Sequence, residues 1–357
     1  MHQLSAVIRR EFPRVFQIYG GPHATLQPEI LLAAPDLDAV CVSLGEEPSL
    51  HLLEQLRAGR DGTRIAGLWV ASGTGEERVV RQNPQQEWPD DADILLGLDH
   101  ALFLNELERF DDFDRAEHNL EIMLSQGCPH SCALCSNRAL REAQGGRFLR
   151  SSVGASIDVL QKALAATGLH RIEFHDEILT VDKAWFREFI GRHASEVAVP
   201  FWCNLPAGAF DEEDVRALKL TGVQRVFLGL ESGNDLVRNA VLKKAITRRQ
   251  LEDSVRWLKE YGVPVVTQNL FGVPSQTPGM FIDTIRMNAS LRLEFMILSV
   301  FHPYPGSEIE ETCREQGLLP DGERSDVVER ADTMLSLPGL PRRDILFYQQ
   351  QRAVRQV

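Results

Sequence analysis

The stretch Leu120-Glu-Ile-Met-Leu124-Ser-Gln-Gly-Cys128-Pro-His-Ser-Cys132-Ala-Leu-Cys135 joins a short apolar run to three cysteines that fall within eight residues. The apolar run predicts a buried β-strand, and the glycine and proline that follow it predict a loop. Three thiolates on one short loop can each hold one iron of an iron–sulfur cube. Such a cube keeps its fourth iron open, which makes it a site for a substrate or cosubstrate.

The remaining cysteines leave two alternatives open. Cys41, Cys203 and Cys313 are scattered along the chain, and Cys203 or Cys313 could reach the loop in space. A fourth cysteine ligand would complete a structural zinc site, which normally uses four ligands in two spaced pairs. It would equally complete the cluster of a non-enzymatic electron-transfer protein.

From residue 119 onward, strand and helix patterns alternate. Strands are predicted at residues 120–124, 171–174, 200–203, 225–230, 264–270 and 295–300, and helices at 153–166, 183–194, 211–220, 248–260 and 277–290. Asp211 and Asp214 are typical of a helix start, whereas Gly222 and Gly262 are typical of helix ends. Alternating units with apolar strands predict an α/β fold with a parallel sheet. Six units favour an open, partial (β/α)6 barrel, in which chemistry is expected at the carboxyl ends of the strands.

The length of 357 residues allows about two domains. Before the barrel, residues 15–45 predict a short strand, a glycine turn, a helix and a second strand. A helix follows at 49–56 with Leu50, Leu53 and Leu56 on one face, and then a hairpin. We therefore predict four regions: a partial α/β domain at 1–81, a linker at 82–117, the barrel at 118–307 and a charged, helical tail at 308–357.

The cysteine spacing after the first strand of a βα series resembles the radical S-adenosylmethionine (SAM) superfamily. The resemblance implies a 4Fe–4S cluster held by Cys128, Cys132 and Cys135, with SAM chelating the open iron. It also implies reductive cleavage of SAM to methionine and a 5′-deoxyadenosyl radical, which abstracts hydrogen from a substrate.

Three further segments at strand ends resemble motifs of the same family. They are Phe-His-Asp-Glu-Ile-Leu-Thr at 174–180, Leu-Gly-Leu-Glu-Ser-Gly at 228–233 and Phe-Gly-Val-Pro at 271–274. The resemblance implies SAM contacts from Asp176, Glu177, Glu231, Ser232 and Gly272. Carboxylates at such positions can accept hydrogen bonds from an ammonium or from ribose hydroxyls. The alternatives are surface charges before a helix for the first segment and ordinary turns for the other two.

The segment Ile-Tyr-Gly-Gly-Pro-His-Ala-Thr at 18–25, with residues 35–40 and 45–47, resembles the C-terminal half of a cobalamin-binding domain. That domain precedes the barrel in the B12-binding-domain-containing subfamily of radical SAM enzymes. The subfamily resemblance implies methyl transfer, with rearrangement or hydrogen abstraction without cobalamin as alternatives. The half that carries the Asp-x-His-x-x-Gly loop, a source of a cobalt ligand, has no counterpart here. We therefore expect this chain alone to bind cobalamin weakly or not at all.

The charge balance narrows the classes of partner that the protein is expected to bind. Lys and Arg number 38 against 51 Asp and Glu, a net charge of −13, which argues against a broad nucleic-acid surface and disfavours an RNA-modifying enzyme. No apolar run approaches the ~18 residues of a membrane helix, and no signal peptide is apparent. We expect a cytoplasmic enzyme with a small-molecule or peptide substrate and a one-electron reductant such as flavodoxin or ferredoxin.

Overall fold

The computed structural model describes residues 2–73, 75–109, 117–293, 295–320 and 330–353. Its contacts divide the chain into two compact units. The first unit comprises Met1–Asp90, Ser136–Arg147 and Tyr304–Ser307, and the second comprises Asp91–Cys135, Phe148–Pro303 and Glu308–Val357. The cysteine loop therefore lies in the second unit.

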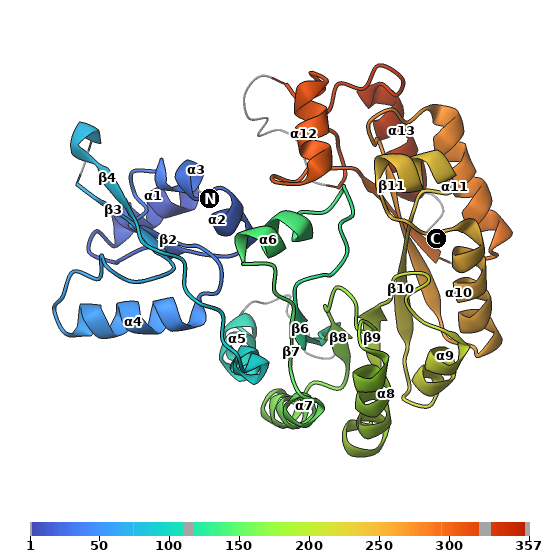
Figure 1. The fold of residues 1–357 in the computed structure, drawn as a ribbon, viewed down its shortest axis with the longest axis horizontal. Helices are drawn as coiled ribbons and strands as arrows, with labels where there is room; N and C mark the ends of the chain where they lie inside the picture. The colour runs from blue at the N-terminus through green and yellow to red at the C-terminus, as the bar shows by residue number, and fades with distance from the viewer. Residues whose placement is uncertain (1, 74, 110–116, 294, 321–329, 354–357) are drawn as a thin grey trace. The chain divides into compact units, whose positions relative to one another are not determined.

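The second unit is built on a six-stranded sheet in the order β12-β11-β10-β9-β8-β5 (Figure 1). The strands are β5 (Leu120–Ile122), β8 (Ile172–Phe174), β9 (Phe201–Asn204), β10 (Arg225–Glu231), β11 (Val265–Phe271) and β12 (Phe295–Val300). Every neighbouring pair is parallel. All six carboxyl ends consequently lie along one edge of the sheet. The α/β class and the six predicted strands are confirmed, and within the described residues the sheet stays open, because β5 and β12 do not pair.

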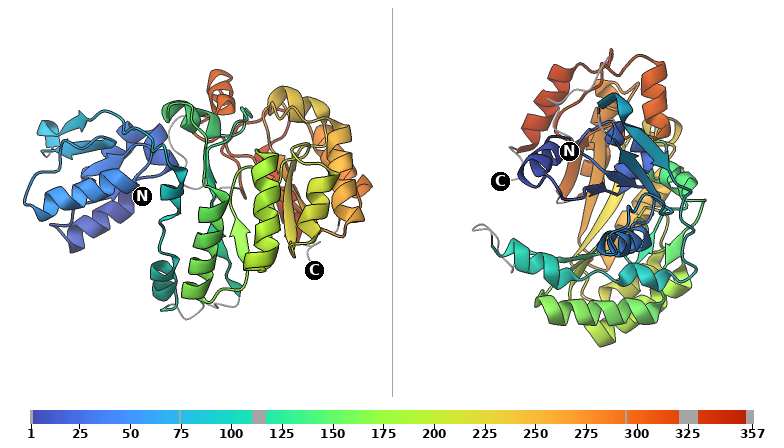
Figure 2. Two further views of the ribbon diagram at one scale, coloured as in Figure 1. Left: turned by 60° about the horizontal axis from the view of Figure 1, so that its bottom comes forward. Right: turned by 90° about the vertical axis from the view of Figure 1, so that its left-hand side faces the viewer.

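Five helices occupy the intervals predicted between these strands. They are α7 (Val153–Thr167), α8 (Lys183–Arg192), α9 (Glu212–Lys219), α10 (Arg248–Glu260) and α11 (Pro278–Ser290). Figure 2, left, shows α7, α8 and α9 side by side in front of the strands. Asp211 and Asp214 form the predicted capping box at the start of α9. Gly222 and Gly262 follow α9 and α10 with positive φ angles, which glycine adopts at no steric cost.

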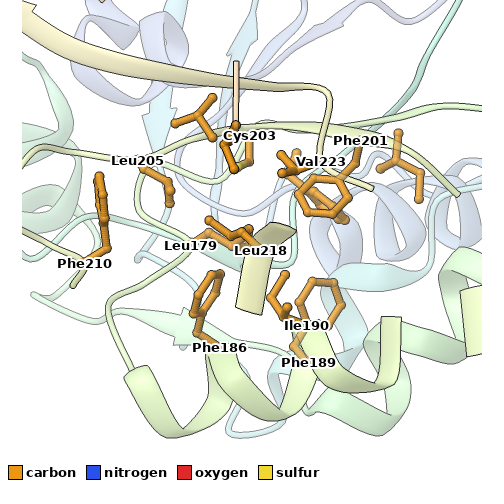
Figure 3. Close-up of a cluster of buried hydrophobic side chains, with 14 of the residues drawn as sticks. Leu179, Phe186, Phe189, Ile190, Phe201, Cys203, Leu205, Phe210, Leu218 and Val223 are labelled. Carbon is orange, nitrogen blue, oxygen red and sulfur yellow. The ribbon is translucent and has the colours of Figure 1, made fainter. Parts of the chain in front are cut away.

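The core of this unit lies between the sheet and these helices. Figure 3 shows Phe186, Phe189 and Ile190 of α8 near Phe201 of β9. Each of these side chains is at most 1% exposed. Burying one such side chain stabilises the fold by roughly 1.5–3 kcal/mol, so α8 is fixed to the sheet chiefly by these contacts.

The residues after β12 belong to the same unit. They form α12 (Glu308–Glu315) and α13 (Arg342–Ala353). Ile309 and Cys313 of α12 and Ile345 of α13 are buried in a second apolar cluster with Phe271 and Phe301. The region predicted as a charged tail therefore supplies apolar core residues to the unit that holds the cysteine loop.

The first unit contains a four-stranded sheet in the order β1-β2-β3-β4. Its strands are β1 (Ile18–Tyr19), β2 (Ala39–Cys41), β3 (Leu68–Ser72) and β4 (Val79–Gln82). β1 and β2 are parallel, whereas β3 pairs antiparallel with both β2 and β4, as the predicted hairpin requires. Helices α2 (Pro22–Leu26) and α3 (Pro28–Leu32) cover one face of this sheet, and α4 (Glu46–Arg57) covers the other (Figure 1).

Several shorter elements complete the described chain. They are α1 (His2–Glu11), α5 (His100–Leu107), α6 (Asn137–Ala143), β6 (Ser125–Gln126), β7 (Leu149–Arg150), the 3₁₀ turns Gly75–Glu77 and Ala92–Leu96, and the π-helices His193–Val197 and Leu236–Val241. Residues 82–117 thus contain a helix that their composition did not indicate. No helix among the described residues is both long and apolar enough to span a bilayer.

The predicted buried face of α4 is wrong. Leu50 and Leu53 are 55% and 54% exposed, whereas Leu52 is 3% exposed. Pro48 and Leu52 are the buried residues of α4 instead, and Leu52 packs against strand residues such as Cys41 and Leu68. Leucine spacing alone does not show which side of a short helix meets a sheet.

Candidate functional site

The cysteine loop begins directly after β5 and β6, at the carboxyl edge of the large sheet. Cys128 is buried, and Cys132 and Cys135 are partly exposed. The backbone of Ala133 fixes the loop on two sides. Its N–H donates to the carbonyl of Leu242 at 3.0 Å, and its carbonyl accepts from the N–H of Ile309 in α12 at 3.1 Å.

The donor set of the loop fits an iron–sulfur cluster. Its three cysteines are close together in the chain, and each thiolate can bind a different iron of one cluster. Burial raises the pKa of the Cys132 thiol, and the nearby ammonium of Lys244 opposes this effect by favouring the thiolate.

The other three cysteines are poor candidates for a fourth ligand. Burial raises the pKa of Cys41 to about 11 and that of Cys313 to about 12. Burial, and next the charge of Asp176, hold the pKa of Cys203 still higher. A ligand must be a thiolate, and all three thiols lie in apolar clusters.

Asp176 and Glu177 follow β8, and the structure gives them different surroundings. Asp176 is 1% exposed. Its carboxylate accepts the N–H of Leu124, at 3.0 and 3.2 Å to its two oxygens, and the hydroxyl of Ser125. Burial raises the pKa of Asp176 even though these hydrogen bonds favour the charged form. Asp176 therefore fastens β6, which leads into the cysteine loop, while Glu177 is exposed. The structure does not bring the two carboxylates together as a pair, and a SAM contact from either stays a prediction.

Glu231, the last residue of β10, has an unusual backbone. Its φ is +60°, and the pairing of β10 with β11 is irregular between Gly229 and Glu231. The Oε1 atom of Glu231 accepts a hydrogen bond from Nζ of Lys244 at 2.6 Å. A Cβ at Gly229 would lie 2.7 Å from Nζ of Lys244 and 2.8 Å from Oε1 of Glu231, so this glycine makes room for the ion pair. Strained conformations of non-glycine residues cluster at functional sites.

Ser232 and Gly233 fasten the end of β10 to α11. Ser232 is fully buried, and its hydroxyl lies 3.4 Å from the Thr284 hydroxyl and accepts the N–H of Asn234 at 3.2 Å. A Cβ at Gly233 would overlap the carbonyl of Asp283. These contacts give no support to the predicted SAM contact of Ser232, and they explain the small residues by packing.

Gly272 follows β11 with φ +79°, a conformation that favours glycine. Its N–H donates to Oε1 of Gln276 at 2.8 Å, and a Cβ there would lie 3.1 Å from Cδ1 of Ile345 in α13. The backbone turn and the close approach of α13 therefore account for a glycine at this position. A SAM contact at Gly272 stays a prediction.

Sequence reasoning assigned no role to Lys244 or Arg238. Lys244 stands next to Lys243 in the sequence, and no spacing indicates that its partner is Glu231. Arg238 is fully buried in the π-helix Leu236–Val241. Its guanidinium donates to the carbonyls of Ser232 and Ile246, at 2.8 and 2.9 Å, and to Asp235, and no sequence pattern indicates these bonds.

Comparison with known proteins finds one family whose sequence pattern matches part of the chain. Residues 122–287 match the family described as the radical SAM superfamily. An uncharacterized methyltransferase of Pyrococcus horikoshii, PH0819, is 27% identical over 307 residues, which cover 85% of this chain and 64% of that protein.

Two solved structures resemble the fold. The radical SAM methyltransferase TsrM from Kitasatospora setae, bound to tryptophan and a SAM analog, matches with a TM-score of 0.69 at 19% identity, over 98% of this chain and 67% of that one. The cobalamin-dependent SAM radical enzyme OxsB, with aqua-cobalamin and SAM bound, matches with a TM-score of 0.72 at 14% identity, over 98% and 55%. The chain thus spans about two thirds or less of the length of each of these relatives. At these identities the structural matches support the fold.

Proposed function

Because residues 122–287 are a domain of the radical SAM superfamily, we propose that the chain is a radical SAM enzyme whose 4Fe–4S cluster is held by Cys128, Cys132 and Cys135. The observation that carries this proposal is the fixed cysteine loop. Backbone hydrogen bonds with Leu242 and Ile309 hold this loop at the carboxyl edge of the sheet. Glu231, whose backbone is left-handed, lies at the same edge.

When bound, the cluster and SAM supply one electron and a sulfonium that is cleaved to methionine and a 5′-deoxyadenosyl radical. The role of the chain's own residues is to bind and orient the cluster and SAM. The three thiolates would hold three irons and leave the fourth for SAM. Glu231 would accept hydrogen bonds from the ribose hydroxyls, and Glu177, exposed after β8, would accept them from the SAM ammonium. Asp176 acts indirectly, by fixing Leu124 and Ser125 before the cysteine loop.

Methyl transfer with cobalamin is the leading reaction type. It is supported by the methyltransferase names of PH0819 and TsrM and by the cobalamin bound in OxsB. Rearrangement or hydrogen abstraction without cobalamin is the alternative. We expect a small-molecule or peptide substrate and flavodoxin or ferredoxin as the reductant.

The test is anaerobic reconstitution with iron and sulfide, followed by SAM and dithionite. We expect close to four irons per chain, with 5′-deoxyadenosine and methionine formed in equal amounts. Methyl transfer from SAM leaves S-adenosylhomocysteine instead of methionine, so adding hydroxocobalamin and measuring both products separates the two reaction types. A reconstituted cluster that yields no 5′-deoxyadenosine and no S-adenosylhomocysteine would contradict the enzyme proposal and favour electron transfer.

A further inference from the structure

Lys244 lies in a loop with an unusual backbone. Its two neighbours, Lys243 and Ala245, have φ angles of +50° and +53°. Left-handed conformations of non-glycine residues cost free energy, on the order of 1–2 kcal/mol each. A fold retains two of them around one residue only where other contacts fix the loop.

Those contacts come from the π-helix that precedes the loop. The N–H of Leu242 donates to the carbonyl of Val237 at 2.9 Å, and the N–H of Lys244 donates to the carbonyl of Arg238 at 3.0 Å. The buried guanidinium of Arg238 then bonds to the carbonyl of Ile246 on the far side of the loop. Hydrogen bonds of residues before and after Lys244 therefore fix the loop that carries it.

The Lys244 side chain points from this loop toward the candidate site. Its side chain is 15% exposed, and its ammonium pairs with Glu231 at 2.6 Å. The carbonyl of Leu242, two residues earlier, accepts the N–H of Ala133 in the cysteine loop. Burial alone would lower the pKa of Lys244, but the charges of Glu231, Cys132 and Cys135 raise it above its ordinary value. Lys244 is therefore a largely buried cation that pairs with a carboxylate and interacts electrostatically with two of the three thiols.

We propose that Lys244 is a positioning residue that sets the reduction potential of the cluster and links it to the state of Glu231. This inference rests on the proposed cluster at Cys128, Cys132 and Cys135. One-electron reduction, with dithionite as the donor, adds one negative charge beside the thiolates. The Lys244 ammonium favours that added charge, and the Glu231 carboxylate opposes it. At short range in a partly buried site, such charges act with little screening.

The neighbouring lysine supplies a matched control. Lys243 has the same charge, but its side chain is 52% exposed and pairs with Glu308 on α12. Lys243→Met removes one positive charge one residue away from Lys244. Solvent already screens that charge, so its removal should leave the potential of the cluster almost unchanged.

The test is a redox titration of the reconstituted full chain, with the reduced cluster followed by electron paramagnetic resonance. We expect Lys244→Met to shift the midpoint potential to a more negative value and Lys244→Arg, which retains the charge, to keep it close to that of the parent chain. Lys243→Met should also keep it. A Lys244→Met potential that equals that of Lys243→Met would overturn the proposal, because a purely structural role changes iron content or stability without moving the potential.

Glu231→Gln provides a second variant if Lys244→Met fails to fold. Removing the carboxylate leaves the Lys244 charge without its counter-ion, so we expect the potential to shift in the positive direction. A negative shift, or no shift, would overturn the proposal. Failure of the proposed function gives a different result, since the parent chain would then hold no cluster or would not cleave SAM.

Discussion

At the scale of single residues, the six cysteines divide into three that share one loop and three that lie apart in apolar clusters. We expect Cys128→Ala, Cys132→Ala and Cys135→Ala each to lose most of the bound iron, because two thiolates hold a cluster poorly. Cys41→Ala, Cys203→Ala and Cys313→Ala are the matched controls, since these thiols are buried with pKa values raised by burial. Iron and sulfide per folded chain is the measurement. Loss of the cluster in any of the three controls would show a fourth protein ligand.

Glu231→Gln should weaken SAM binding while the iron content stays unchanged. The substitution keeps the shape but removes the charge that strengthens hydrogen bonds to ribose hydroxyls, a loss of about 1–3 kcal/mol. Calorimetric titration of the reconstituted protein with SAM measures the effect. Glu252→Gln, on the exposed side of α10 where Glu252 pairs with Arg248, is the control. Equal affinities for the two variants would assign Glu231 to a structural turn.

The sequence predicted which residue types stand at the strand ends, because parallel strands bring those positions to one edge. It did not predict how the side chains pair. The contact between Glu231 and Lys244 depends on three left-handed residues and on the absence of a side chain at Gly229. Asp176 shows the same limit, since its burial depends on Ser125 and Leu124 of a different strand.

At the scale of elements, Asp176 joins β8 to the strand that leads into the cysteine loop. We expect Asp176→Asn to lower the free energy of unfolding by about 1–3 kcal/mol, because it weakens bonds to a charged acceptor in a buried position. The same change should reduce cluster loading. Glu177→Gln, one residue away and exposed, should alter neither stability nor loading. Denaturant unfolding and iron analysis measure both quantities, and equal behaviour of the two variants would contradict this role.

The π-helix that extends α8 contains a titratable core residue. His193 is fully buried between Phe174, Phe189 and Phe201, and neither ring nitrogen has a hydrogen-bond partner. Burial lowers the pKa of His193 from 6.5 to about 4. The unfolded chain therefore binds this proton more readily, so stability is complete above pH 6.5 and falls as the pH drops toward 4, by at most about 3 kcal/mol.

Denaturant unfolding at several pH values between 7 and 4 measures that loss. His193→Phe removes the titrating group and keeps an aromatic ring in the cluster, so the part of the pH dependence that depends on His193 should disappear. An unchanged profile in the variant would show that other groups determine the acid sensitivity.

Helix positions were predictable where caps and alternation agreed, as in α9 with its Asp211–Asp214 box. α4 was different, because its leucines occupy several sides of the helix and only packing against the sheet selects Leu52. The local sequence pattern shows the spacing of apolar residues along a helix. The surface against which the helix packs determines which of its sides is buried.

At the scale of the whole molecule, the four-stranded sheet of the first unit bears on cobalamin binding. Among the described residues, β1 and β2 are its one parallel pair, and β1 lies at its edge. A cofactor site in doubly wound folds lies in the crevice between two halves, at the ends of the strands. We therefore expect this chain alone to bind hydroxocobalamin weakly or not at all in equilibrium dialysis read by absorbance. Tight, stoichiometric binding would contradict this expectation and would strengthen methyl transfer as the reaction.

The bond between Ile309 and Ala133 also bears on how the protein matures. A ribosome completes the cysteine loop long before it adds α12, which fixes that loop through the carbonyl of Ala133. During translation the three thiols are consequently present without the element that holds their backbone. Cluster insertion is thus expected to follow synthesis of α12, and the iron–sulfur assembly machinery would meet a chain that already contains this helix.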